Sequence, residues 1–159
     1  MTNDIETHFE ASCARRNEFW RRVGKVEGDV IGHLVNPAFM GGPRWPALRQ
    51  SFITVRKNSS TIIASDGLSD PFDDSDEKAD KTRNGFGLEF YVETPGDLDP
   101  VIGSWQFQLL WQMSQNAAYM GDVRNVLAEL KYVTTELYDV NVPNESQVPA
   151  FASVTHPAG

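Results

Sequence analysis

The chain has one cysteine, Cys13, three histidines and no long apolar run. A single cysteine excludes an internal disulfide, and the scattered histidines provide no closely spaced pair of zinc ligands. No stretch approaches the roughly 20 apolar residues that span a bilayer. Basic residues are also few: 14 Lys and Arg stand against 22 Asp and Glu, for a net charge of −8. This balance disfavours a nucleic-acid partner and suits a basic protein partner.

What is present fits a globular protein. The 159 residues are enough for one domain, and 40% of them are hydrophobic, so a core needs no disulfide or metal. The first ten residues are polar and acidic and lack the apolar centre of a signal peptide. We therefore expect a cytoplasmic protein that does not associate with a membrane.

Apolar periodicity predicts helices at residues 3–24 and 99–121. The first has a capping box at Asn3 and Glu6, and Arg16 interrupts its apolar face, on which Cys13 is expected to be a small buried hydrophobe. Gly24 is expected to end it in a left-handed conformation. The second helix ends at Gly121, and a short helical turn is expected at 123–130. The predicted apolar face of the second helix carries Trp105, Leu109, Met113, Ala117 and Met120, and Leu110 and Ala118 widen it.

Strands are predicted at 28–36, at 51–57 and 61–65 as a hairpin, at 85–94, and at 131–143. Between the first two, residues 37–48 are expected to form a loop that packs through Phe39 and Trp45. The strand at 85–94 alternates apolar and polar residues, so we expect it inside the sheet and covered by the second long helix. The predicted fold is a single α+β domain over 1–159. It has a mixed β-sheet, flanking α-helices and a weakly structured tail at 143–159.

Residues 66–80 contain seven of the 22 carboxylates and one base, Lys78. A calcium loop starting at Asp74 fails because Lys78 and Ala79 occupy positions that need a ligand and a glycine. Ser69 follows Gly67 as in a nucleophile elbow, but Pro71 replaces the second glycine. We interpret "DGLSD" as a structural turn, with Gly67 at positive φ, Leu68 pointing inward and local hydrogen bonds from Asp66 and Ser69.

Three glutamates on predicted strands are better placed for acid–base chemistry: Glu89, Glu93 and Glu136. A carboxylate- or metal-dependent hydrolase that uses them, or the acidic segment, is therefore the alternative function. No catalytic, metal-binding or cofactor-binding residue can be assigned, because the chain shows no motif with the required spacing.

The ordered set "ASDGLSDPF", "NGFGLEFYVET" and "WQFQLLWQMSQNAAYMGD" resembles the suppressor of fused domain family, from about Ser51 to Asp122. "YVTTELYDVNVP" is similar to the strand that follows in bacterial members. The resemblance implies an α+β domain without known catalytic residues or cofactor. It also implies binding of a protein partner, and for bacterial members a role as an immunity protein that neutralises a polymorphic toxin. The chain departs from the family at its C-terminal end, where a further apolar strand is usual.

We therefore expect a non-catalytic protein-binding module whose partner is a basic toxin or effector domain. Its contact surface is expected at the acidic segment and a neighbouring strand edge, where carboxylates would steer a basic partner. The predicted partner-binding residues are Asp70, Phe72, Asp73, Asp74, Asp76, Glu77 and Asp80.

Overall fold

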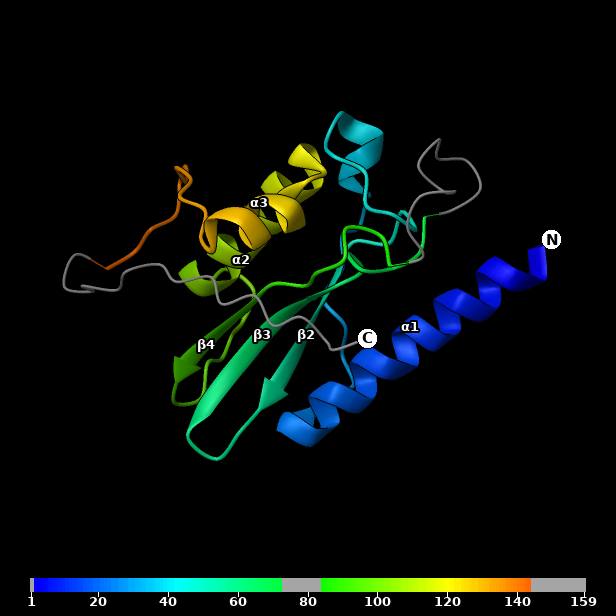
Figure 1. Cartoon of the computed structure of the whole chain (residues 1–159). Helices are drawn as coiled ribbons and strands as arrows, with labels where there is room; N and C mark the ends of the chain where they lie inside the picture. Colours follow the sequence, from blue (N-terminus) through cyan, green and yellow to red (C-terminus); the bar gives the residue numbers. More distant parts are fainter. Residues whose placement is uncertain (1, 73–83, 144–159) are drawn as a thin grey trace.

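The structure is a computed structural model that describes residues 2–72 and 84–143. Its elements, in chain order, are α1 (Thr2–Val23), β1 (Lys25–Val26), the 3-10 helix η1 (Pro37–Met40), β2 (Ser51–Arg56), β3 (Ser60–Asp66), β4 (Tyr91–Pro95), α2 (Trp105–Met120) and α3 (Val123–Leu130). Figure 1 shows α2 and α3 on one side of the sheet and α1 on the other. None of the described helices is long and apolar enough to cross a membrane.

The sheet has the order β1-β2-β3-β4. The predicted hairpin is confirmed, with β2 and β3 paired from Ser51 opposite Asp66 to Arg56 opposite Thr61. Every described pairing of strands is antiparallel, whereas a mixed sheet was expected. The α+β class, with helices flanking one sheet, is confirmed.

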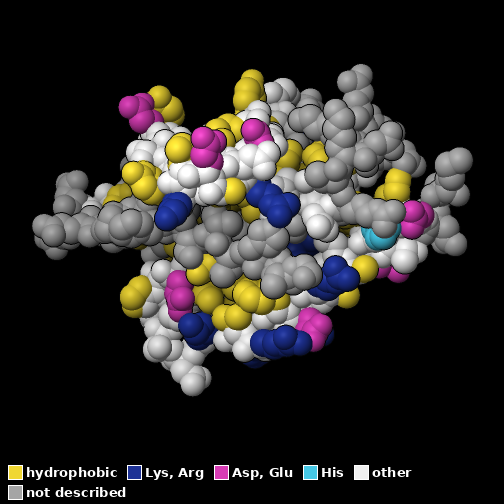
Figure 2. All heavy atoms as spheres, in the orientation of Figure 1, with side chains coloured by type: hydrophobic (Ala, Val, Ile, Leu, Met, Phe, Trp, Pro, Cys, Tyr) yellow, Lys and Arg dark blue, Asp and Glu magenta, His cyan; other side chains and the backbone are white. Residues whose placement is uncertain are grey.

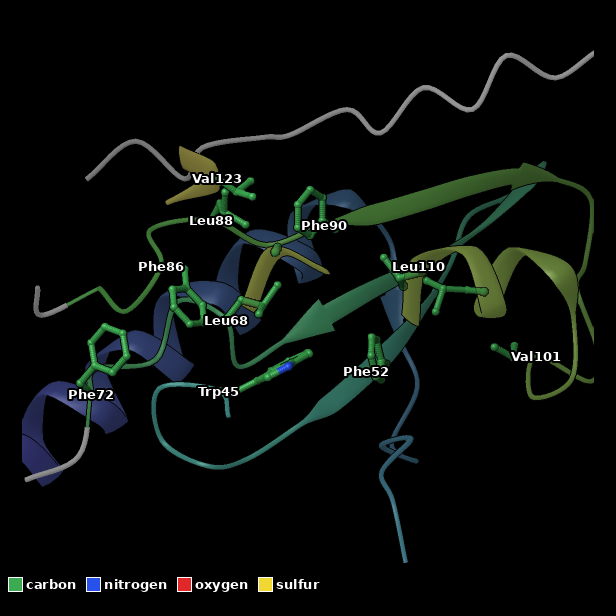
Figure 3. Close-up of a cluster of buried hydrophobic side chains, with 12 residues drawn as sticks. Trp45, Phe52, Leu68, Phe72, Phe86, Leu88, Phe90, Val101, Leu110 and Val123 are labelled. Atoms are coloured by element: carbon green, nitrogen blue, oxygen red, sulfur yellow. The ribbon is translucent and has the colours of Figure 1, made fainter. Parts of the chain in front are cut away.

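Alternation along β2 and β3 divides the core between the two faces of the sheet. Phe52 and Ile63 point to the α2 face, where they join Trp45, Leu68 and sixteen other apolar side chains of the main cluster and its rim. Figure 3 shows this cluster, with Leu110 of α2 above the sheet and Phe72 against Phe86. The opposite face carries a smaller cluster in which Trp20 of α1 packs on Ile53, Val55, Ile62 and Ala64.

The predicted apolar face of α2 is buried only in part. Leu110 and Ala117 are the apolar residues that α2 buries, while Met120 is exposed. Apolar periodicity did not predict the whole buried face of α2, because three buried positions are polar: Gln106, Ser114 and Gln115. Each of the three side chains donates a hydrogen bond inside the protein, although Gln115 Oε1 has no partner among the described residues. The Gln115 side chain, for instance, donates to Gln50 Oε1 at 2.8 Å. Gly121 ends the helix as predicted, at a φ of 69°.

The strand predicted at 85–94 is shorter and lies at the edge of the sheet, not inside it. β4 begins only at Tyr91, and it pairs with β3. Phe86, Leu88 and Phe90 are buried in the main cluster as expected, but they precede the strand. Turn geometry at residues 84–86 keeps this stretch out of the ladder.

Four other local expectations are wrong. In 28–36 only Ile31 forms a β-bridge, with Phe52, and 131–143 contain no strand. Trp45 is fully buried, but Phe39 of the same loop is exposed. Gly24 follows α1 without a positive φ, and it is required for space, since a Cβ there would lie 2.6 Å from the Arg56 carbonyl oxygen.

Candidate functional site

Two arginines and three carboxylates meet inside the protein, where α1 crosses the end of β3. We call this group the ionic cluster. Its members come from five places in the chain: Arg16 in α1, Arg49 before β2, Asp66 at the end of β3, Asp70 in the following turn and Glu89 before β4.

Arg16 is the centre of the ionic cluster, and only 5% of its surface is exposed. Its Nε lies 2.8 Å from Asp66 Oδ1 and its Nη2 lies 2.5 Å from Asp70 Oδ1. Nη1 donates to the hydroxyls of Ser12 and Ser69. Burial acts to lower the pKa of Arg16, but the carboxylates of Glu89, Asp70 and Asp66 outweigh burial, so this pKa is raised. The guanidinium is therefore a permanent charge.

Arg49 closes the ionic cluster toward the surface. Its Nη1 lies 2.7 Å from Asp66 Oδ2 and its Nη2 lies 3.1 Å from Asp70 Oδ2. The two oxygens of Asp66 are therefore shared between two guanidiniums. The Arg49 guanidinium also lies over the Phe9 ring, 5.5 Å from its centroid. With 32% of its side chain exposed, Arg49 is better hydrated than Arg16.

Glu89 is held by the turn that follows β3. The backbone N–H groups of Gly67, Leu68 and Ser69 donate to its carboxylate, at 3.0, 3.3 and 2.9 Å. The hydroxyls of Ser65 and Ser69 donate as well, at 2.6 and 2.7 Å. Successive N–H groups that converge in this way form an anion-binding concavity. Two arginines thus serve Asp66 and Asp70, and the backbone serves the third negative charge.

The turn after β3 and the segment at 84–89, which carries Glu89, can pack together only because residue 85 is glycine. This residue has a φ of 51°, and a Cβ on it would lie 2.3 Å from the Asp70 carbonyl oxygen and 2.7 Å from that of Leu68. Only glycine allows the two segments to come so close. "DGLSD" and "NGFGLE", which carry the resemblance, are therefore the two halves of one buried contact.

The structure partly agrees with the interpretation of "DGLSD" as scaffold. Gly67 has a φ of 150° and Leu68 is fully buried, as expected. The hydrogen bonds expected to be local are instead long-range, because Asp66 and Ser69 bond to Arg16 and Glu89.

Two of the predicted partner-binding residues lie in the interior. Asp70 is fully buried in the ionic cluster and Phe72 packs against Phe86, so neither presents its side chain to a partner. The other five, Asp73, Asp74, Asp76, Glu77 and Asp80, lie outside the described residues.

The three candidate glutamates do not come together. Glu89 is in the ionic cluster, Glu93 pairs with Lys57 at 2.8 Å, and Glu136 accepts from the Tyr138 hydroxyl at 3.2 Å. Cys13, expected to be a buried hydrophobe, is only half buried, with its Sγ 3.5 Å from Arg16 Nη2. Burial raises the pKa of this thiol despite the two neighbouring arginines.

A second group of charged side chains surrounds Arg56. A hollow of about 620 Å³ at the end of the β2–β3 hairpin is lined by Arg56, whose guanidinium joins Glu27 at 2.7 Å and Asp97 at 2.6 Å. Over 2–72 and 84–143, no group of three or more His, Cys, Asp or Glu side chains is arranged to hold a metal ion.

A scan of protein-family models and searches of curated proteins and solved structures found no match to this chain.

We expect the stability of the protein to fall in acid through Asp66. Burial would raise the pKa of this carboxyl, but Arg16 and Arg49 lower it below its ordinary value. A lowered pKa adds stability above the unfolded value of about 3.9, and this stability is lost as the pH falls through the folded pKa. Urea unfolding from pH 7 to pH 2 gives the difference in unfolding free energy between the parent and Asp66→Asn. This difference should be constant down to about pH 5 and become smaller below it. A difference that stays constant to pH 2 would contradict the assignment.

Proposed function

We propose that this protein is a non-catalytic protein-binding module. The observation that carries the proposal is a group of large apolar side chains exposed between β1 and β2, which we call the apolar loop: Leu34, Val35, Phe39 and Met40. Leu34 is fully exposed, and Phe39 and Met40 expose 73% and 78% of their surface. Large apolar side chains that are exposed within a few residues of one another favour an interaction site.

The apolar loop has a fixed conformation, which favours recognition over random exposure. Asn36 Oδ1 accepts from the Ala38 N–H at 2.9 Å, and the Asn36 side chain also donates to the Leu48 carbonyl. The Trp111 indole donates to His33 Nε2 at 3.3 Å, which ties the loop to α2. Burial lowers the pKa of His33, so its ring is neutral and can accept this bond. A loop ordered in advance loses less entropy on binding.

The charge of the chain favours a basic partner. The net charge is −8, and Figure 2 shows apolar side chains between charged groups on the face it displays. Together with the resemblance to the suppressor of fused family, this supports an immunity protein that neutralises a basic toxin in the cytoplasm. The steering role expected for Asp73–Asp80 belongs to the same proposal.

The hydrolase alternative has less support. Catalysis would require a carboxyl with free hydrogen-bonding capacity near a second reactive group. Glu89, the most buried candidate, already accepts five hydrogen bonds. Its surroundings favour a structural role.

The test is a co-expression pull-down with the product of the adjacent gene, using the parent and a Leu34→Asp/Phe39→Asp variant. We expect a one-to-one complex with the parent and at least a tenfold weaker one with the variant, because two carboxylates would have to be desolvated in the interface. Unfolding free energies should differ by less than about 1 kcal/mol, since both positions are exposed. Val30→Asp, an exposed apolar residue outside the apolar loop, is the matched control. Recovery of no partner at micromolar concentration, or equal binding by the variant, would refute the proposal.

A further inference from the structure

Three side-chain amides form a line along α2. Gln108, Gln112 and Asn116 are spaced four residues apart, so they lie one above another on the same side of the helix. This side points away from the core, which α2 contacts through Leu110 and Ala117. We call these three residues the amide row.

Gln112 binds the backbone of a residue far along the chain. Its Oε1 accepts from the Tyr138 N–H at 3.0 Å, and its Nε2 donates to the Tyr138 carbonyl oxygen. The side-chain amide therefore contacts the N–H and the C=O of one residue, as a neighbouring strand would. One turn along, Asn116 Nδ2 donates to the Thr135 hydroxyl at 3.5 Å. Residues 132–142, the orange coil after α3 in Figure 1, thus run beside the amide row.

These contacts with 132–142 are few and exposed. The segment has no regular secondary structure, and none of its side chains belongs to either apolar cluster. Tyr138, the residue that Gln112 holds, exposes 70% of its surface. A segment with exposed hydrogen bonds and little apolar burial opens at a low free-energy cost.

The third member of the amide row is not used by this segment. Gln108 Oε1 is buried and has no hydrogen-bond partner among the described residues. Thr135 and Tyr138 are three residues apart and meet amides one helical turn apart, so Asn141 would come level with Gln108. The chain turns away there, because the Val142 N–H bonds to the Val140 carbonyl at 2.9 Å. An acceptor without a donor has a free-energy cost, and a longer extended segment would remove it.

We propose that the amide row is a docking site for an extended polypeptide backbone, occupied in the free protein by residues 132–142 and in the complex by an extended segment of the partner. The inference rests on the proposed function and specifies one contact of the partner. Recognition is through main-chain N–H and C=O groups, because both described hydrogen bonds between Gln112 and Tyr138 involve the Tyr138 backbone. The partner segment would also supply a donor to Gln108.

The experiment uses the full chain and a fluorescent peptide with the sequence of residues 131–143 as the probe, with binding measured by anisotropy. Tyr138→Pro removes the N–H that Gln112 accepts, so it releases the chain's own segment and leaves the amide row intact. We expect this variant to bind the peptide about tenfold or more tightly than the parent, in which the tethered segment competes at high effective concentration. Tyr138→Ala keeps the N–H and should behave as the parent. Adding Gln112→Ala to Tyr138→Pro should abolish the gain.

Three outcomes would overturn the docking site. They are no tighter binding by Tyr138→Pro, no loss on adding Gln112→Ala, or a gain in Tyr138→Ala equal to that in Tyr138→Pro. Unfolding in urea should be nearly the same for all variants, because the positions are at the surface. The proposed function is measured separately, through the apolar loop and the co-expressed partner. Failure of the amide row therefore leaves that pull-down unaffected, and failure of the pull-down leaves the peptide result unaffected.

Discussion

Arg16→Ala should lower the free energy of unfolding by about 3–5 kcal/mol, the cost of leaving buried carboxylates without their partner. Asp70 is fully buried and Asp66 nearly so, and Arg49 alone cannot occupy the positions of both guanidiniums. The protein has a typical domain size, so such a loss would remove much of its stability. Urea unfolding followed by circular dichroism and by Trp fluorescence measures it.

Arg15→Ala is the matched control, because Arg15 is the adjacent arginine of α1 and is exposed. It should change the unfolding free energy by less than about 0.5 kcal/mol. Arg16→Lys should recover only part of the loss, since an ammonium cannot reach Asp66, Asp70 and Ser69 with fixed planar geometry. If Arg16→Ala and Arg15→Ala had equal effects, α1 would not depend on the ionic cluster.

Glu89→Gln should cost about 2–4 kcal/mol, although it removes one of three buried negative charges. The glutamine side chain has one acceptor oxygen for the donors that now converge on two, and its NH₂ group would face backbone N–H groups. Buried donors left without an acceptor each cost about 1–3 kcal/mol. Urea unfolding at pH 7 gives the difference.

Glu93→Gln is the control for this substitution, because Glu93 lies four residues further along the chain, at the surface, paired with Lys57. It should cost less than about 1 kcal/mol, as for exposed ion pairs. A neutral or stabilising Glu89→Gln would mean that the negative charge of the ionic cluster is in excess. In that case Glu89 would again be a candidate for acid–base chemistry.

Local patterns in the sequence predicted the helices and the hairpin, which depend on interactions between residues close in the chain. The β2–β3 hairpin follows from two β-branched runs with a short polar connection, and α1, α2 and α3 follow from apolar periodicity and their ends. The edge position of β4 could not be predicted, because apolar side chains indicate that a segment is buried and do not indicate how many strands pair with it. The strand predicted at 131–143 is absent for a related reason: Thr135 and the backbone of Tyr138 bond to side chains of α2 and not to a neighbouring strand.

Local sequence patterns could not predict the ionic cluster, with the exception of one of its members. Arg16 interrupts an otherwise apolar face of α1, and a charge in such a place is the signal that it has a buried partner. The partners could not be identified, because Asp66 and Asp70 are 50 and 54 residues away. Glu89 was recognised as a candidate carboxylate, but the backbone donors around it depend on the turn at Gly67–Ser69, which spacing alone does not reveal.

The same sequence separations bear on how the protein folds. Arg16 cannot find its carboxylates until the β2–β3 hairpin has formed and the turn after it has closed around Glu89, while the hairpin itself needs only contacts between neighbours in sequence. We therefore expect α1 to dock late in folding, after the main barrier. Interactions that form after the transition state act mainly on the rate of unfolding. We therefore expect the ionic cluster to slow unfolding. In stopped-flow experiments the loss of stability expected for Arg16→Ala should appear as a faster unfolding rate with a nearly unchanged refolding rate.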